Sequence, residues 1–343
     1  MTKTDPSASR RTPRAAAGVA LAIAVALAAG GAAGADEGKW ILRIEPMLMD
    51  AYGHDQHVLT IHEIDRGATP QVDTKTPVNL DTGADVAYHA EFIYKWKQWG
   101  LGTDFFWFNT QQGRESRSAA AGAPGDAVVF AVADRSFTST GPGEVLYFSI
   151  LGDTDLIAWT ADLYAMRTLA ETPESAIHLR LGVRVADFDN DFHAAAGIRD
   201  AFGSLVDASS NYGLMPGPLV GLAGEVRRGK HLFEGYLAQS VVLADAELSG
   251  MTSDFTGSAE TPSVFNQEVF HKVQDVAIPI TDIRLRWTYG VTERISLGLG
   301  AHSSVWWDVP VPPGVIPGPG GNEAFLENTI VYLGWLGSVG ITF

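Results

Sequence analysis

Strict alternation of apolar and polar side chains is the feature that most limits how this chain can fold. Between residues 84 and 96, one set of alternate positions is apolar and the other carries mostly polar or charged groups. In a β-strand, successive side chains point to opposite faces, so the pattern predicts a strand with one apolar and one polar face. The apolar positions are Ala84, Val86, Tyr88, Ala90, Phe92, Tyr94 and Trp96, and Asp85, His89, Glu91 and Lys95 lie between them.

Ten segments share this pattern, each close to the length that a tilted strand needs to cross a bilayer. Although 46% of the chain is hydrophobic, no run after residue 35 approaches the roughly 18 uncharged apolar residues of a membrane-spanning helix. We therefore predict an all-β protein, a transmembrane antiparallel up-and-down β-barrel of ten strands. The segments are residues 40–49, 84–96, 101–110, 155–168, 177–185, 217–227, 231–242, 282–289, 295–307 and 329–343.

The connections between these segments alternate between short and long, which predicts short periplasmic turns and long extracellular loops. The long connection 111–154 leaves the strand count open, because residues 128–133 and 145–151 are themselves strand-like. They form either two more spanning strands, making twelve, or a ribbon above the membrane, and we expect ten. The short links are 97–100, 170–175, 228–230 and 290–294, and the other long ones are 50–82, 188–213, 243–275 and 308–327.

The first 35 residues have the pattern of a secretory signal. Basic residues, among them Arg10, Arg11 and Arg14, precede an apolar stretch that ends on small residues, as in segments removed after export. We predict a signal peptide at 1–35 and the barrel at 36–343, with a membrane anchor as the alternative. Residues 1–35 hold four of the 24 Lys and Arg residues and one of the 40 Asp and Glu residues, so the formal charge of the remainder is −19. That charge disfavours a nucleic-acid partner.

The chain ends on an alternating strand whose last residue is Phe343. A terminal aromatic residue on such a strand is typical of the signal that hands outer-membrane barrels to their insertion machinery. We therefore expect the outer membrane as the location, with its lipid, lipopolysaccharide and the insertion machinery as partners; the oligomeric state leaves no signal. Aromatic residues at the predicted strand ends would form two interfacial girdles, with Trp40, Trp96, Trp99, Trp287, Tyr289 and Phe343 on the periplasmic side and Trp107, Trp306 and Trp307 on the other.

Part of the chain resembles a known family. The features are the alternating strand 177–187, the Gly-Pro-Leu-Val-Gly-Leu stretch at 217–222, the hairpin 282–299 with Trp306 and Trp307 after it, and the C-terminal strand. Over roughly residues 176–343 this arrangement resembles the pore-forming major outer membrane protein family first named from Legionella. The resemblance implies a barrel that conducts small solutes, and it carries over no catalytic residue.

The polar faces of the predicted strands would place many charges of both signs inside the barrel. Barrels of about eight strands are filled by their own side chains and those of about sixteen enclose a channel, so ten strands fit a narrow pore for small solutes or ions. The alternative is a structural or adhesive surface barrel with a plugged lumen. Arg180, Arg184, Arg284 and Arg286 would favour anions in a pore. The expected lining residues are Arg43, Glu45, Asp85, His89, Glu91, Lys95, Asp104, Asp162, His178, Arg180, Arg184, Glu225, Arg227, Glu234, Asp282, Arg284 and Arg286.

A third hypothesis is an outer-membrane lipid hydrolase. His302 and Ser304 share one strand face, as a base and a nucleophile would, with Glu323 or Glu327 as a conceivable third member. By alternation the pair points inward, where lipid does not reach, so we expect no enzyme. An omptin-like protease would also have ten strands, but no paired-acid motif stands out at the strand tops.

We expect neither a cofactor nor a metal. Asp187, Asp189 and Asp191 open an outer loop like a calcium loop, but Phe192 and Ile198 stand where such a loop has Gly and Glu. We interpret these residues as a solvated acidic turn.

Overall fold

A computed structural model gives the fold of this chain. The predicted signal peptide and the glycine-rich stretches 122–125 and 314–321 lie outside the residues that it describes. Those residues are 38–52, 56–65, 72–80, 84–115, 127–132, 135–139, 148–198, 202–256, 263–311 and 326–343.

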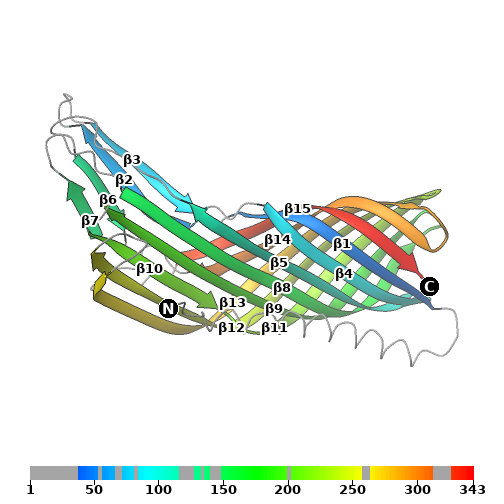
Figure 1. The fold of residues 1–343 in the computed structure, drawn as a ribbon. Helices are drawn as coiled ribbons and strands as arrows, with labels where there is room; N and C mark the ends of the chain where they lie inside the picture. Colours follow the sequence, from blue (N-terminus) through cyan, green and yellow to red (C-terminus); the bar gives the residue numbers. More distant parts are fainter. Residues whose placement is uncertain are drawn as a thin grey trace, which may run out of the picture.

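Ten antiparallel strands close into one barrel (Figure 1), which confirms the predicted fold class. Each strand pairs with its neighbours in chain order, and the first strand pairs with the last, with Ile41 opposite Thr342. The strands are β1 (Lys39–Tyr52), β4 (Ala84–Trp96), β5 (Trp99–Glu115), β8 (Phe148–Glu171), β9 (Ser175–Ile198), β11 (Met215–Arg228), β12 (His231–Thr256), β13 (Ser263–Gly290), β14 (Ile295–Val311) and β15 (Leu326–Thr342).

The twelve-strand alternative is excluded. Residues 128–132 lie in β6 (Ala127–Val132), which belongs to a separate four-stranded sheet with β2 (Gln56–Asp65), β3 (Val72–Leu80) and β7 (Arg135–Ser139). Residues 148–151 begin β8, a barrel strand. The separate sheet stands beyond one end of the barrel (Figure 1).

All four predicted short links are turns, and they lie together at one end of the barrel, which we call the turn end. Two are two-residue hairpins, in which Lys97 and Gly229 have φ values of 51° and 59°. A residue in this left-handed backbone conformation lets a tight turn follow the twist of the two strands that it joins. The first residue of β1 and the last of β15 lie at the same end (Figure 1). We call the opposite end, which bears the four-stranded sheet, the loop end.

The predicted loops 188–213 and 243–275 are wrong, because most of their residues form strands. β9 continues to Ile198. The next strand, β10 (Phe202–Asn211), pairs with both β9 and β12 and continues the barrel wall on the loop-end side of β11. β12 and β13 pair as far as Thr256 and Ser263. Outward side chains here meet water, so the apolar alternation stops while the backbone pairing continues.

The outer surface of the barrel is apolar from the turn end to a defined height. On β9 the outward residues run from Ile177 to Val185, and the same outward series becomes acidic at Asp187. On β12 the change comes at Asp245. Trp335 of β15 is 77% exposed. An apolar surface of this extent is far larger than soluble monomers expose, and it has the layout of a lipid-facing band.

Among the predicted girdle residues, Trp306 is the one that does not lie on this outer surface. Trp307 is exposed, but Trp306 is fully buried. Trp306 follows His302 and Ser304 on the inward side of β14, so alternation sends it into the barrel.

No helix among the described residues is long and apolar enough to cross a membrane.

Inward glycines allow close contact between bent strands. A Cβ atom at Gly182 would lie 2.1 Å from the carbonyl oxygen of Leu163, and one at Gly300 would lie 2.2 Å from that of Leu285. Either would collide with the neighbouring backbone, so strands β9 and β14 need glycine where they coil.

Replacing Leu181, in the middle of the apolar series on β9, by Arg should destabilise the membrane-embedded barrel by about 2–4 kcal/mol, because the charge would face hydrocarbon. The matched control is Asp245→Arg, above the apolar surface, where the change should be small. Unfolding by denaturant in lipid vesicles, followed by tryptophan fluorescence, measures both. Equal losses for the two variants would contradict the assignment of the outer face to lipid.

Candidate functional site in the barrel interior

The inward charges expected from the sequence fall into three groups by exposure. Lys95, Glu225, Glu234 and Asp85 are half-buried, and Arg227 is exposed at the turn end. Asp104 is buried. Eleven others are buried as well: Arg43, Glu45, His89, Glu91, Asp162, His178, Arg180, Arg184, Asp282, Arg284 and Arg286.

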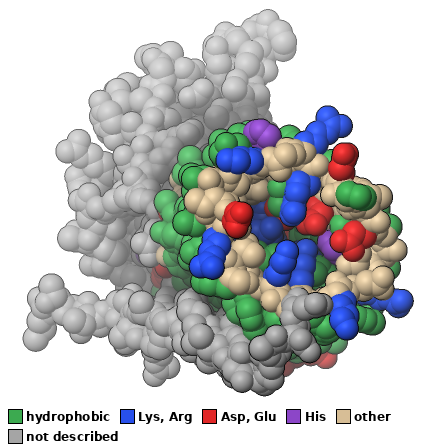
Figure 2. Space-filling view, turned by 90° about the vertical axis from the view of Figure 1, so that its right-hand side faces the viewer, with side chains coloured by type: hydrophobic (Ala, Val, Ile, Leu, Met, Phe, Trp, Pro, Cys, Tyr) green, Lys and Arg blue, Asp and Glu red, His purple; other side chains and the backbone are tan. Residues whose placement is uncertain are grey.

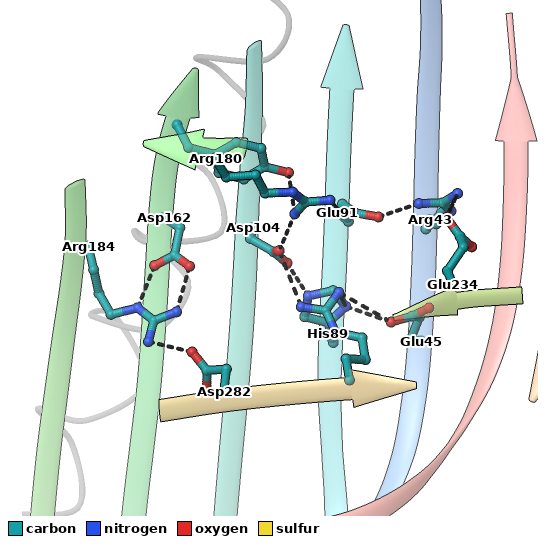
Figure 3. A network of polar contacts seen from close by, with 12 residues as sticks. Arg43, Glu45, His89, Glu91, Asp104, Asp162, Arg180, Arg184, Glu234 and Asp282 are labelled. Atoms are coloured by element: carbon teal, nitrogen blue, oxygen red, sulfur yellow. Dashed lines mark hydrogen bonds and ion pairs between the residues drawn. The ribbon is translucent and has the colours of Figure 1, made fainter. Parts of the chain in front are cut away.

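Glu91 of β4 lies at the centre of a network of ion pairs (Figure 3). Its carboxylate is 2.6 Å from Nη1 of Arg43, 2.9 Å from Nη2 of Arg180 and 3.5 Å from Nη2 of Arg286. These guanidiniums come from β1, β9 and β13, three separate parts of the wall. One buried carboxylate therefore ties together strands that are not neighbours in the sheet.

One pair crosses the whole width of the lumen, and others link strands that are closer together. Arg284 of β13 lies 3.3 Å from Asp104 of β5, and these strands stand five positions apart around the ring of ten. Arg286 pairs with Glu45 of β1, and its Nε donates to Glu234 of β12 over 2.9 Å. The network therefore bridges the lumen at this level.

Arg184 makes a second cross-lumen link. It donates to both oxygens of Asp162, its partner on the neighbouring strand β8, over 2.7 and 2.6 Å. Its Nη1 lies 2.5 Å from Asp282 of β13 (Figure 3). A bidentate guanidinium–carboxylate pair is the strongest geometry of this type, so Arg184 holds β8, β9 and β13 in a fixed arrangement.

His89 bridges two carboxylates. Its Nδ1 lies 2.8 Å from Glu45, and its Nε2 contacts Asp104. Ionised carboxylates only accept hydrogen bonds, and a neutral imidazole donates from one nitrogen alone. The doubly protonated ring satisfies both contacts, and it would balance the six carboxylates of the network against five guanidiniums. The carboxylates are Glu45, Glu91, Asp104, Asp162, Glu234 and Asp282, and the guanidiniums are Arg43, Arg180, Arg184, Arg284 and Arg286.

Two tyrosines that the sequence analysis did not assign to the site also belong to the network. The guanidinium of Arg180 lies 4.6 Å from the ring of Tyr164 and 4.6 Å from that of Tyr236, and it donates to the Tyr164 hydroxyl over 2.9 Å. Cation–π contacts of this kind are strongest when the pair is shielded from water. Both tyrosines occupy inward positions, so the alternation of their strands contained the signal.

An apolar cluster fills the lumen on the loop-end side of the network. Rings of Phe106, Phe108, Phe188 and Trp306 pack around Tyr332 and Tyr212 at centroid distances of 5.2–6.2 Å. Aliphatic and small side chains from the surrounding strands complete the cluster, and they are buried. On the turn-end side, a cavity of about 30 Å³ remains. The interior is therefore packed with polar and apolar layers.

His302 and Ser304 both face inward and are buried. The acid beside them is Asp282 of β13, which is opposite Ser304 in the register and 3.9 Å from Nε2 of His302. Ser304 Oγ accepts a hydrogen bond from Trp306 Nε1 over 3.1 Å. Of the acids suggested by the sequence, Glu323 lies outside the described residues.

The other suggested acid, Glu327, lies in β15 opposite Pro310. The sequence analysis missed Asp282 as the neighbour of this pair, because the register between two strands is not readable from one of them.

The acidic series Asp187, Asp189 and Asp191 lies within β9, and not in a loop as expected. It continues the outward face of the strand above the apolar surface, and Trp159 Nε1 donates to Asp187 over 3.0 Å. Within the described ranges, no group of three or more His, Asp or Glu side chains is placed to hold a metal ion.

Comparison with known proteins gives no family for the chain. No family model matches it, and no curated protein does. The structure is similar to that of the outer membrane protease OmpT from Escherichia coli, with 13% identity, a TM-score of 0.46, and coverage of 89% of this chain and 96% of that one. It also matches the CymD monoaromatic hydrocarbon channel, with 8% identity, a TM-score of 0.23, and coverage of 89% and 88%.

A third match is the toluene transporter TodX from P. putida, with 9% identity, a TM-score of 0.16, and coverage of 90% of both chains. At these identities, none of the three carries a residue role to this chain.

Replacing Arg184 by Met should lower the free energy of unfolding by about 3–5 kcal/mol, because two buried carboxylates lose their guanidinium. The double variant Arg184→Met/Asp162→Asn should lose less, since one uncompensated charge is gone. Arg228→Met, at the exposed end of β11, is the control and should change little. Denaturant unfolding measures all three, and a cost for Arg184→Met no larger than that of the control would contradict the buried network.

Proposed function

We propose that the chain is an outer-membrane barrel with a closed interior, which anchors the sheets at its loop end rigidly at the cell surface. The observation that supports this most directly is the filled lumen, in which Arg284 reaches Asp104 across the full width and the apolar cluster packs above them. This is the structural or adhesive surface barrel that we predicted from the sequence as the alternative to a pore.

The narrow pore is the competing function. A solute path along the axis requires several buried pairs to separate, and removing one partner of such a pair typically costs about 3–5 kcal/mol. Opening the network alone would not suffice, because the aromatic cluster blocks the axis beyond it. The resemblance of residues 176–343 to the Legionella-type family favours the pore, and that resemblance stays a prediction.

The outer-membrane location rests on the outer face. Its apolar surface needs lipid, and the region above it carries exposed acids at Asp245, Glu247 and Asp275. Divalent cations between such carboxylates and lipopolysaccharide phosphates would attach this region to the outer leaflet. Phe343, 68% exposed at the end of the chain, is the residue that we propose the insertion machinery recognises.

The lipid hydrolase is the weakest of the three functions. His302 is 3% exposed and Ser304 is 1% exposed, and both lie between the ion-pair network and the aromatic cluster. A lipid ester would have to enter the packed lumen to reach Ser304. We therefore give His302 and Ser304 a packing role beside Asp282 and Trp306.

Planar-bilayer recordings of the refolded barrel should show no unitary current steps at modest voltage, because both layers of the interior would have to rearrange before ions pass. A porin of about sixteen strands, which encloses a water channel, reconstituted in the same way, is the positive control. Regular steps from the barrel itself would contradict the closed interior and establish the pore.

A further inference from the structure

The cavity at the turn end is the part of the interior that the closed network leaves open. It lies between the network and the mouth of the barrel, where the ends of β4, β9, β11 and β12 meet. Viewed from the turn end, basic and acidic side chains surround and fill this mouth (Figure 2). At about 30 Å³, it has room for two or three waters at roughly 10–15 Å³ each, or for one small oxyanion.

Donor groups on the wall of this cavity lack close acceptors. Lys95 Nζ has one ion pair among the described residues, with Glu225 at 3.8 Å, which is beyond hydrogen-bond range. His178 Nδ1 contacts Thr168 Oγ1 at 3.0 Å, but its buried Nε2 has no hydrogen bond and lies 4.0 Å from Glu225. The side chain of His178 is only 7% exposed. In the network, by contrast, Glu91 is held at 2.6 and 2.9 Å.

These groups indicate the charge and the hydrogen-bonding character of a ligand that would fit the cavity. A buried donor without an acceptor is costly. Lys95 Nζ is a donor, and His178 Nε2 is a donor in the tautomer whose Nδ1 accepts a hydrogen bond from the Thr168 hydroxyl. No carboxylate oxygen of the lining residues Glu91, Glu225 and Glu234 is buried without a partner in the described part of the chain. Among the described lining residues, Lys95 is the cation without a carboxylate in hydrogen-bond range, since Arg43, Arg180, Arg284 and Arg286 already pair with acids of the network. A ligand that fits is therefore an acceptor with negative charge.

We propose that the turn-end cavity binds one small water-soluble oxyanion, a carboxylate or phosphate group, through Lys95 and His178. Glu225 is the internal competitor, because its carboxylate faces both donors at long range and is itself partly exposed at the mouth. When the oxyanion enters, it accepts hydrogen bonds from the two donors and Glu225 turns toward solvent. Strands surround the cavity on all sides, so a lipid headgroup in the leaflet does not reach it.

This site is independent of the closed lumen. Its opening faces the turn end, and the two proposed binding groups, Lys95 and His178, are not partners of Glu91. A barrel that proved to conduct and a barrel that proved to be closed would both retain the site.

Titration calorimetry on the full chain in a nonionic detergent, at fixed ionic strength, tests the proposal. Inorganic phosphate and acetate are the probes, and at least one should bind saturably. Lys95→Gln should weaken binding about tenfold or more, because a charged donor is lost, and Glu225→Gln should tighten it. Ala223→Leu, which fills the cavity without changing its charge, should abolish binding.

Two control variants remove the same charges from the exposed turns nearby. Lys230→Gln and Glu174→Gln should leave the affinity unchanged within about twofold, since exposed rim charges act weakly. Heat-modifiable migration on gels confirms that each variant is folded. Absence of saturable binding of both probes to the wild type, or equal effects of Lys95→Gln and Lys230→Gln, would overturn the proposal and leave the cavity to water.

Discussion

Closure of one antiparallel sheet is the constraint on which the rest of the structure depends. Because β1 pairs with β15 and every other barrel strand pairs on both sides, the described barrel presents no free sheet edge to hydrocarbon, where each unpaired backbone group would cost several kcal/mol. Closure also divides side chains into two sets. At the height of the apolar surface, outward positions such as Ile177 to Val185 suit lipid, and charged groups such as Arg180 and Arg184 take inward positions.

The closed sheet places two demands on the interior. Ten strands enclose more space than two rows of side chains fill, yet the inward positions carry many ionised groups. The structure meets both demands by stacking layers. Arg180 and Arg284 reach from non-neighbouring strands to Glu91 and Asp104, and aromatic rings around Tyr332 fill the next level. Satisfied polar networks of this kind rigidify a core and specify its arrangement.

The alternation along single strands made the barrel predictable from sequence. In segments such as 177–185 and 282–289, one strand is enough to show which face is apolar. The ten such segments indicated the strand count and the inward charges, and the short links between them indicated the four turns. Beyond the apolar surface that signal ends. At Asp187 the outward face becomes polar, so the sequence predicted a loop where β9 and β10 still pair.

Contacts across the lumen could not be predicted in the same way. Pairing of Arg284 with Asp104, or of Arg184 with Asp282, depends on strand order, tilt and register together. The composition of the inward set allowed a plug or a passage equally. Our proposal of a plug rests on the three-dimensional placement of the arginines and of Trp306, which we had predicted in the outer girdle.

Cysteine scanning along β12 tests the central claim, that the outer face meets lipid and the inner face is a packed core. The chain contains no cysteine, so single substitutions at positions 237–244 of the membrane-embedded barrel are unambiguous. Positions 237, 241 and 243 should react with a lipid-soluble thiol reagent and not with a charged one, and 238, 240 and 242 should react with neither. Rapid reaction of the inward positions with the charged reagent would show a water-filled lumen and contradict the account.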